Sequence, residues 1–495
     1  MNKKSDIPLI VTDSAALRAL PTRRDFVRLL ARGGTLVLSG ALLAACEDPT
    51  NTGGLTGPGT GGTLTIDFSK GDVALLQFLY VLEQLEAEFY SRVVAHFDSS
   101  DFTSADRLAL TDVANHEAIH RDVLATVLGP DATSRITPFF GAAGFTVRAD
   151  VLATARDFED LGVSAYNGIA PHFTDANNLA LAEKIASVEA RHSATIRDLL
   201  SPLANTFAPT DFDGALSPAT VATDLQPLLE DRLVFANAPA SLALVPGSSA
   251  VTSQAPSDVL SALQFVLRIA ELQADFYQRG ASVSGLIPSS DAQVFATIAG
   301  QETAHVSQLQ SLISLRGAAA AARPSFDFTA KGNLPGFAFL AAQYATFSML
   351  AQALEDFGVR AWKGQLKALV EDKSALSSAV SMHSVQARHA SEIRRLRGKK
   401  GWITGNNRDD LPPFMQAVYD GEENITQGSA NAGSIAVNFG GASSATEAFD
   451  EALTTTQATA FLALFLPIEA AFRGQYGAPR VDSVTISTRP CVSDR

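Results

Sequence analysis

The chain has 495 residues, which is too long for one hydrophobic core and predicts two or three domains. Hydrophobic residues make up 46% and charged residues 18% of the chain, as is typical of globular proteins. The formal net charge of -14 argues against nucleic-acid binding, which needs basic surfaces. The two cysteines, Cys46 and Cys491, lie in unrelated surroundings, so we expect neither a disulfide framework nor a thiolate metal site.

Residues 1–45 have the layout of an export signal. The string TRRDFVR at 22–28 resembles the twin-arginine motif, in which two arginines precede an aromatic and an aliphatic residue. A moderately apolar stretch from Gly34 to Ala45 follows, and it is too short to span a membrane as a mature helix. The resemblance implies export by the twin-arginine route, which carries proteins that are already folded.

The end of this stretch, Leu43-Ala44-Ala45-Cys46, resembles a bacterial lipobox. A lipobox would place a lipid on Cys46 after cleavage and anchor the protein to a membrane of the bacterial cell envelope, on the periplasmic face or at the cell surface. The alternative is simple cleavage at a small-residue site that leaves Cys46 unmodified. We favour lipidation because the motif and its position agree. No other segment reaches the roughly 18 uninterrupted apolar residues that a membrane-spanning helix needs.

The rest of the chain divides by composition and periodicity. Residues 46–71 are rich in Gly, Thr and Pro and predict a flexible tether. Helical periodicity predicts a first helical domain over 72–203, a linker over 204–257, a second helical domain over 258–400, and a mixed C-terminal extension over 401–495.

The two helical domains are copies of one another. Segments 77–90, 114–120, 158–166 and 188–192 match segments 264–277, 299–305, 354–362 and 385–389, in the same order. Four matching helices predict two homologous bundles. In both copies a long connection separates the second helix from the third, a crossover found in ferritin-like bundles and absent from simple up-and-down bundles.

This organisation resembles the ferritin-like di-metal carboxylate family, and the tandem exported form is similar to bacterial ferritin-like and desiccation-related proteins. The resemblance implies an all-α fold with two tandem ferritin-like four-helix bundles and a mixed C-terminal extension. It also implies a cofactor of two iron or manganese ions.

The first copy carries two Glu-x-x-His pairs, Glu117 with His120 and Glu189 with His192. Residues three apart share one face of a helix, so each pair can point into the bundle. A carboxylate can bridge two cations while the imidazole binds one of them. The other two helices then need one further carboxylate each.

On the third helix of the first copy Glu159 fits this role, and Tyr166 follows it seven residues later. On the first helix Glu83 has the same spacing to Tyr90 and is favoured over Glu86 and Glu88. The predicted metal ligands are Glu83, Glu117, His120, Glu159, Glu189 and His192. Tyr90 and Tyr166 match Tyr277 and Trp362 in the second copy, so we expect both to be ordinary aromatic core positions.

The alternative to a metal centre is a polar core held by hydrogen bonds alone. Burying four carboxylates without cations would raise their pKa values and cost several kcal/mol, which favours metal. Because the predicted ligands are carboxylates and imidazoles, iron or manganese is favoured over copper or thiophilic metals.

The second copy departs from this pattern, because Ala270 stands at the position of Glu83 and Gln386 at that of Glu189. Glu271 lies one residue away and would point about 100° around the helix. The residues that remain form a weak or vestigial second site: Glu302, His305, Glu355 and His389. We expect this copy to be a scaffold. His383, three residues before Gln386, could substitute as a ligand, but a lone extra histidine is more often incidental. For His96, His116 and His172 the sequence indicates no partner.

Two functions follow. The first is a di-iron or di-manganese protein of the cell envelope that oxidises Fe(II) or removes peroxide in stress protection. The second is a structural or desiccation-stress envelope protein whose metal site is not catalytic.

Overall fold

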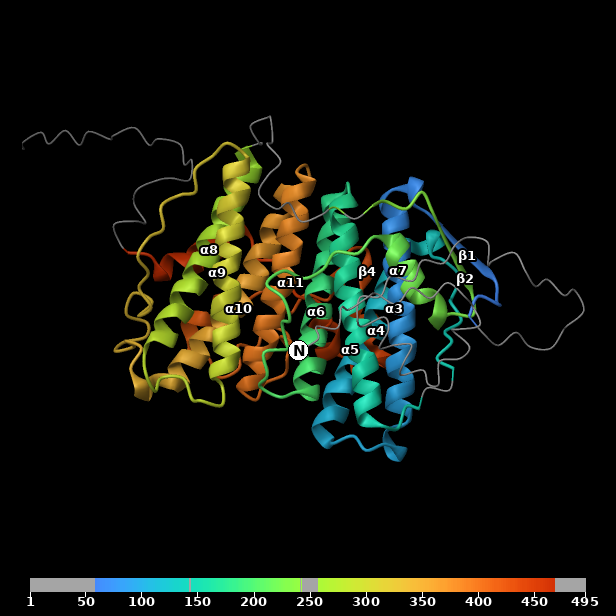
Figure 1. Cartoon of the computed structure of the whole chain (residues 1–495), viewed down its shortest axis with the longest axis horizontal. Helices are drawn as coiled ribbons and strands as arrows, with labels where there is room; N and C mark the ends of the chain where they lie inside the picture. The colour runs from blue at the N-terminus through green and yellow to red at the C-terminus, as the bar shows by residue number, and fades with distance from the viewer. Residues whose placement is uncertain (1–57, 142–143, 241, 243–256, 468–495) are drawn as a thin grey trace, which may run out of the picture. The chain divides into compact units, whose positions relative to one another are not determined.

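Within the described residues, eight long helices form two four-helix bundles (Figure 1). The computed structural model describes residues 58–141, 144–240, 242 and 257–467. The predicted export signal, the lipobox and Cys46 lie outside them. The first bundle consists of α3 (Asp72–Ala95), α4 (Ser104–Leu128), α5 (Arg148–Ile169) and α6 (Ala176–Leu200). The second consists of α8 (Ser257–Ser282), α9 (Ala292–Leu315), α10 (Tyr344–Leu366) and α11 (Lys373–Leu396). The predicted tandem four-helix architecture is confirmed.

Polar side chains at the helix starts account for several of these boundaries. Thr103 and Asp106 form a capping box at the start of α4, in which each side chain accepts from the other residue's backbone N–H. Asp175 caps α6 and Asp372 caps α11, with their carboxylates accepting from free N–H groups of the first turn. These caps stabilise helix ends that the periodicity alone places only approximately.

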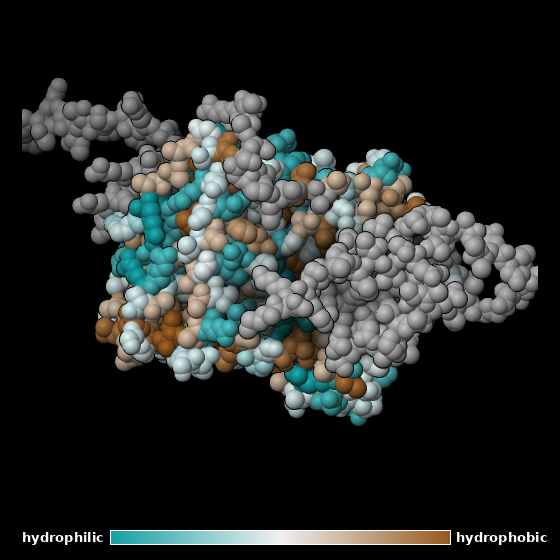
Figure 2. Space-filling view, viewed as in Figure 1, coloured by the Kyte–Doolittle hydropathy of each residue, from teal (hydrophilic) through white to brown (hydrophobic). Residues whose placement is uncertain are grey.

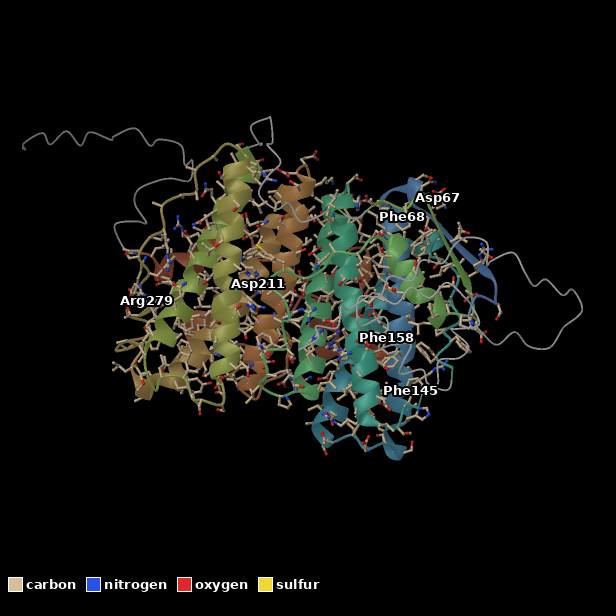
Figure 3. The ribbon with its side chains drawn as sticks, viewed as in Figure 1. Asp67, Phe68, Phe145, Phe158, Asp211 and Arg279 are labelled. Carbon is tan, nitrogen blue, oxygen red and sulfur yellow. The ribbon has the colours of Figure 1, made fainter. Side chains whose placement is uncertain are left out.

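The two long crossovers, residues 129–147 and 316–343, bring aromatic side chains onto the bundles. In the first bundle Phe89 packs edge-on against Phe158, with ring centroids 4.8 Å apart, and with tilted rings against Phe145 from the crossover, at 5.8 Å. Phe158 and Phe145 are labelled in Figure 3. In the second bundle Phe276, which matches Phe89, packs against Phe328 of its own crossover at 5.4 Å. These contacts fasten each crossover to the core of its bundle, because a buried aromatic pair stabilises the fold by more than its buried apolar area alone.

The segments between and after the bundles contain short elements of their own. Strand β1 (Thr63–Asp67) pairs in parallel with β2 (Arg232–Ala236), and β3 (Thr426–Gln427) pairs with β4 (Ala430–Asn431) in antiparallel. The short helices are α7 (Pro218–Leu225), α12 (Ala432–Ile435), α13 (Ala442–Glu447) and α14 (Thr455–Leu462). The strand pairs were not predicted, because such short strands show no periodicity of their own.

The two bundles pack through α6 and α11, which lie side by side (Figure 1). At the centre of this contact is a small apolar cluster formed by Val163, Ala190, Val359, Ala387 and Ala390. The small side chains allow the helices to approach closely.

Two ion pairs cross the same contact, one of them fully buried. Arg191 Nη2 on α6 lies 3.2 Å from Asp356 Oδ1 on α10, and Arg388 Nη2 on α11 lies 3.3 Å from Asp160 Oδ1 on α5. Arg191 matches Arg388 and Asp160 matches Asp356 in the repeat, so each bundle contributes the same two residues. The bundles therefore meet as two equivalent halves.

On the face seen in Figure 2, hydrophilic and hydrophobic residues are interspersed along the helices. Among the described residues, none of the helices is both long and apolar enough to cross a membrane.

Candidate metal centre

All six predicted ligands of the first bundle meet inside it. Each has a relative exposure of 0%. Helix α3 contributes Glu83, α4 contributes Glu117 and His120, α5 contributes Glu159, and α6 contributes Glu189 and His192. The side chains that the sequence places on four separate helices thus form one buried cluster.

The two imidazoles face the carboxylates through Nδ1. His120 Nδ1 lies 3.1 Å from Glu189 Oε1, 3.3 Å from Glu83 Oε2 and 3.6 Å from Glu117 Oε2. His192 Nδ1 lies 2.8 Å from Glu117 Oε1 and 3.6 Å from Glu159 Oε2. Each histidine therefore defines its own group of oxygen ligands.

These contacts produce two overlapping ligand groups whose atoms lie within 4.8 Å of one another: Glu83, Glu117, His120 and Glu189, and Glu117, Glu159, Glu189 and His192. Glu117 and Glu189 belong to both groups, whereas Glu83 and Glu159 each belong to one. Two shared and two unshared carboxylates are the set that would hold a pair of cations, with the shared ones able to contact both.

The hydrogen bonding of the cluster is incomplete in a way that fits cations. Nine buried side-chain atoms make no hydrogen bond to any residue that the structure describes: Glu83 Oε2, Glu86 Oε2, Glu117 Oε1 and Oε2, His120 Nδ1, Glu159 Oε2, Glu189 Oε1 and Oε2, and His192 Nδ1. Although the two Nδ1 atoms lie within 3.6 Å of five of these oxygens, none of those contacts forms a hydrogen bond. A buried polar atom without a hydrogen bond costs about 1–3 kcal/mol, so nine of them in one place need an explanation. Every one is a lone-pair donor that a hard or borderline cation accepts.

The other ring nitrogens of the two histidines are already engaged. His120 Nε2 lies 2.6 Å from the carbonyl oxygen of Ala448, and His192 Nε2 lies 2.9 Å from His116 Nδ1. A proton on each Nε2 leaves the Nδ1 lone pair for a metal. The sequence indicated no partner for His116, and the structure supplies one: the ring stacks on His192 with ring centroids 5.2 Å apart.

The tyrosines are more than aromatic core positions, contrary to the sequence-based expectation. The Tyr90 hydroxyl donates to Glu159 Oε1, and the Tyr166 hydroxyl donates to Glu83 Oε1. Each tyrosine thus occupies one oxygen of a terminal carboxylate and leaves the other oxygen free. The equal spacing of seven residues on α3 and α5 could have indicated this role. With that spacing Tyr90 on α3 meets Glu159 on α5, and Tyr166 on α5 meets Glu83 on α3.

Glu86 is a fifth buried carboxylate at the cluster, although the spacing to Tyr90 favoured Glu83 over it. Its exposure is 2%, and its Oε1 lies 3.0 Å from the position a Cβ would take on Gly162. Glu189 Oε2 lies 3.4 Å from the same position. Glycine at 162 therefore makes room for two carboxylates on the α5 side of the cluster.

Burial raises the pKa values of Glu83, Glu86, Glu159 and Glu189, whereas for Glu117 the contacts with His120 and His192 outweigh burial and lower the pKa. Burial raises the pKa of Glu83 to about 7, although His120 works against it. Burial and the neighbouring carboxylates raise the pKa values of Glu86 and Glu189 well above the usual range. For His192 burial favours the neutral ring, but Glu159 and Glu117 outweigh it and raise the pKa to about 10. Without cations, the cluster therefore holds protons that a metal would displace.

Both bundles match the same known family. A ferritin-like domain matches residues 71–202 and again residues 258–399, together more than half of the chain. The chain belongs to the ferritin-like family. No curated protein matches it.

The second ferritin-like domain keeps only part of the cluster. Glu302, Glu355 and His389 are buried and have ligand atoms within 4.8 Å of one another. His305 is also buried, and its Nδ1 lies 3.7 Å from Glu302 Oε2. His383 lies elsewhere, with its Nδ1 3.3 Å from Glu183 Oε2.

Amides replace two carboxylates in this second domain. Gln273 stands at the position of Glu86 and Gln386 at that of Glu189, and Gln273 Nε2 donates to Gln386 Oε1 at 2.8 Å. Gln273 Nε2 also lies 3.1 Å from Glu355 Oε2, and Gln386 Nε2 donates to Glu302 Oε1. Trp362 occupies the position of Tyr166, opposite the lost carboxylate at Ala270.

The two ferritin-like domains therefore differ most in their unpartnered atoms. In place of the nine in the first domain, the corresponding positions of the second leave two without a hydrogen-bond partner among the described residues, Gln273 Oε1 and Glu302 Oε2. Trp362 Nε1, at the position of Tyr166, is a third atom without such a partner. The second cluster satisfies its polar groups with its own amides, so it has much less need of a cation.

Proposed function

We propose that the first ferritin-like domain binds two iron or manganese ions. The observation that carries this proposal is a set of nine buried atoms that make no hydrogen bond within the described residues: seven carboxylate oxygens and the two Nδ1 atoms of His120 and His192. Glu117 and Glu189 would bridge the two ions. Glu83 and His120 would complete one coordination sphere, and Glu159 and His192 the other.

The donor set selects the metal class. Carboxylate oxygens and imidazoles without a thiolate favour iron or manganese over softer metals. A bound pair of such ions would supply redox chemistry toward oxygen or peroxide, in the form of Fe(II) oxidation or peroxide removal. The protein's part is to hold the carboxylates with one free oxygen each, which the hydrogen bonds from Tyr90 and Tyr166 support.

We also propose that the protein works at the bacterial cell envelope. The twin-arginine string at 22–28 and the lipobox ending at Cys46 support export and lipid anchoring. Fractionation of cells that express the native chain or Cys46→Ala tests the anchor. Native protein in the membrane fraction and the variant in the soluble fraction are expected, and equal distribution of the two would contradict it.

A structural role of the metal site in a desiccation-stress envelope protein is the second candidate. It is favoured by the complete burial of the six ligands beneath the described residues, which leaves none of them open to solvent. The two candidates differ in whether the metal-loaded protein consumes oxygen or peroxide. Stoichiometric metal without consumption of oxygen or peroxide would support the structural role.

Metal analysis tests the proposal. Protein purified from cells rich in iron and manganese is expected to contain about two such ions per chain, and Glu117→Ala is expected to contain none. The matched control is Glu302→Ala, the same change at the same position of the second domain, which should leave the metal content unchanged. Absence of metal from the native protein would overturn the proposal.

A further inference from the structure

The repeat extends beyond the four helices of each domain. Two similar strings follow the two domains. FDGALS lies at 212–217, after the first domain, and FDEALT lies at 449–454, after the second. Each string ends on a helix cap, Ser217 for α7 and Thr454 for α14. We call residues 207–217 the first tail and residues 400–454 the second tail.

Each tail packs back on the third helix of its own domain. The N–H of Leu216 donates to the carbonyl of Ser164 at 2.8 Å, and that of Leu453 donates to the carbonyl of Arg360 at 3.0 Å. Ser164 and Arg360 occupy matching positions of α5 and α10. The tails are therefore equivalent parts of the two repeats.

Before this return, each tail crosses to the other domain. His305 Nε2, in the second domain, lies 2.8 Å from the carbonyl oxygen of Asp211, and Figure 3 shows Asp211 against the helices of that domain. In the first domain His120 Nε2 lies 2.6 Å from the carbonyl oxygen of Ala448. The next residue of each tail, Phe212 or Phe449, packs on the same imidazole, with ring centroids 5.7 Å and 5.5 Å apart.

Buried ion pairs hold the crossing in place. Asp213 Oδ2 of the first tail lies 2.8 Å from Arg388 Nε of the second domain. Asp450 Oδ2 of the second tail lies 2.8 Å from Arg191 Nε of the first domain. Because these four side chains are almost completely buried, removing one partner would leave an uncompensated charge.

The second tail also reaches the second histidine of the first domain. His192 Nε2 lies 2.9 Å from His116 Nδ1, and His116 Nε2 faces Glu447 Oε2 at 3.5 Å. Lys400 Nζ lies 2.9 Å from Glu447 Oε1 and holds this carboxylate. Trp402 packs edge-on against His192, with ring centroids 5.7 Å apart.

We propose that the second tail orients both imidazoles of the metal centre in the first domain. The carbonyl of Ala448 orients His120 directly, and Glu447 orients His192 through His116. Acceptors at the two Nε2 atoms fix the ring rotation and the tautomer in which Nδ1 is free to bind a metal. The centre of the first ferritin-like domain is thus completed by positioning groups from the second repeat. This inference rests on the proposed metal binding.

The second domain shows which substitutions preserve such a contact. Gln301 stands at the position of His116, and His389 Nε2 lies 2.7 Å from Gln301 Oε1. Gln301 Nε2 donates in turn to the carbonyl of Ala208 in the first tail at 2.9 Å. An amide at position 116 can therefore accept from His192, whereas a leucine cannot.

The test measures Co(II) affinity of the full chain by the visible absorption of the bound ion, with thermal unfolding of the metal-free protein recorded in parallel. His116→Leu is expected to weaken binding about 10- to 100-fold, as is usual when the partner of a metal-bound histidine is lost. His116→Gln should recover most of the affinity. Phe449→Ala should weaken binding, whereas Phe212→Ala, the same change in the other tail, should affect unfolding to a similar extent and leave affinity at the native value.

The outcomes separate the two proposals. If the native chain binds no Co(II), the proposed function fails. If the native chain binds Co(II) and both His116→Leu and Phe449→Ala bind it equally well, only the positioning role is overturned. Equal losses in Phe449→Ala and Phe212→Ala would also overturn it, because they would reflect general destabilisation.

Discussion

The contrast between the two domains predicts that the first cluster can be converted into the second. The perturbation is the double substitution Glu86→Gln with Glu189→Gln, which copies the pair Gln273 and Gln386. Space for it exists, because Gln273 and Gln386 each approach to 2.7 Å of the Cβ position of Gly358, the match of Gly162.

The expected change in the free energy of unfolding follows from the buried atoms that lack a hydrogen bond. Glu86 and Glu189 contribute three of them, Glu86 Oε2 and both oxygens of Glu189. Each unsatisfied buried group costs about 1–3 kcal/mol, and a new amide hydrogen bond contributes about 1 kcal/mol. Because protons on the two carboxyls already relieve part of the repulsion, we expect the metal-free double variant to be more stable than the native metal-free protein by about 2–4 kcal/mol.

The same variant should lose the metal pair, since it lacks one of the two bridging carboxylates. The assay is calorimetric unfolding of chelator-treated protein, followed by metal analysis after reloading with Mn(II). The matched control is the reverse exchange, Gln273→Glu with Gln386→Glu, which should lower metal-free stability. A double variant that is less stable than the native metal-free protein, or that still binds two ions, would refute the reasoning.

Three further predictions concern single features. Metal binding should release protons and strengthen as pH rises, because the raised pKa values mean that at neutral pH His192 (about 10) is protonated and Glu83 (about 7) is partly protonated in the metal-free cluster. Calorimetric titration with Mn(II) in two buffers of different ionisation enthalpy measures the released protons, and a value of zero would contradict the prediction. The thermal stability of the metal-free protein should change with pH in the opposite direction. Glu83 and His192 bind more protons in the folded than in the unfolded state, so this stability should fall as pH rises through their folded pKa values of about 7 and about 10. Tyr166→Phe removes the hydrogen bond to Glu83 and should cost about 1–2 kcal/mol in the metal-free state, with a changed Co(II) spectrum; an unchanged spectrum and melting temperature would count against a role for the hydroxyl. Gly168→Ala would place a Cβ 1.8 Å from the carbonyl oxygen of Leu216 and should destabilise the protein by about 2–3 kcal/mol, measured by thermal unfolding. The control is Gly300→Ala, where a Cβ would meet no described atom within 4 Å apart from its chain neighbours and its own helix backbone.

Much of the candidate centre could be predicted because most of its ligands are recognised by their spacing within a single helix. Glu117 with His120 and Glu189 with His192 lie three residues apart, and the geometry of a helix alone puts each pair on one face. The equal spacing to Tyr166 and Tyr90 then favoured Glu159 and Glu83 on the other two helices. The second copy served as a comparison. It also exposed the loss of ligands at Ala270 and Gln386, because the two copies align there without a gap.

Glu86 shows the limit of such reasoning. Glu83 and Glu86 are three residues apart and share a helix face, so spacing could not exclude either of them. Their roles differ because Gly162 on α5 leaves room beside Glu86, and that is a property of the packed bundle.

The sequence by itself determined the helical periodicity, the duplication and the ligands on each helix, because these depend on residues a few positions apart. Only the tertiary structure decided that the two repeats exchange their tails. The partners of His120 and His192 come from Ala448 and, through His116, from Glu447, residues far along the chain that no local spacing connects. Contacts of this kind arise from the packing of α6 against α11, which brings the end of each repeat over the other domain.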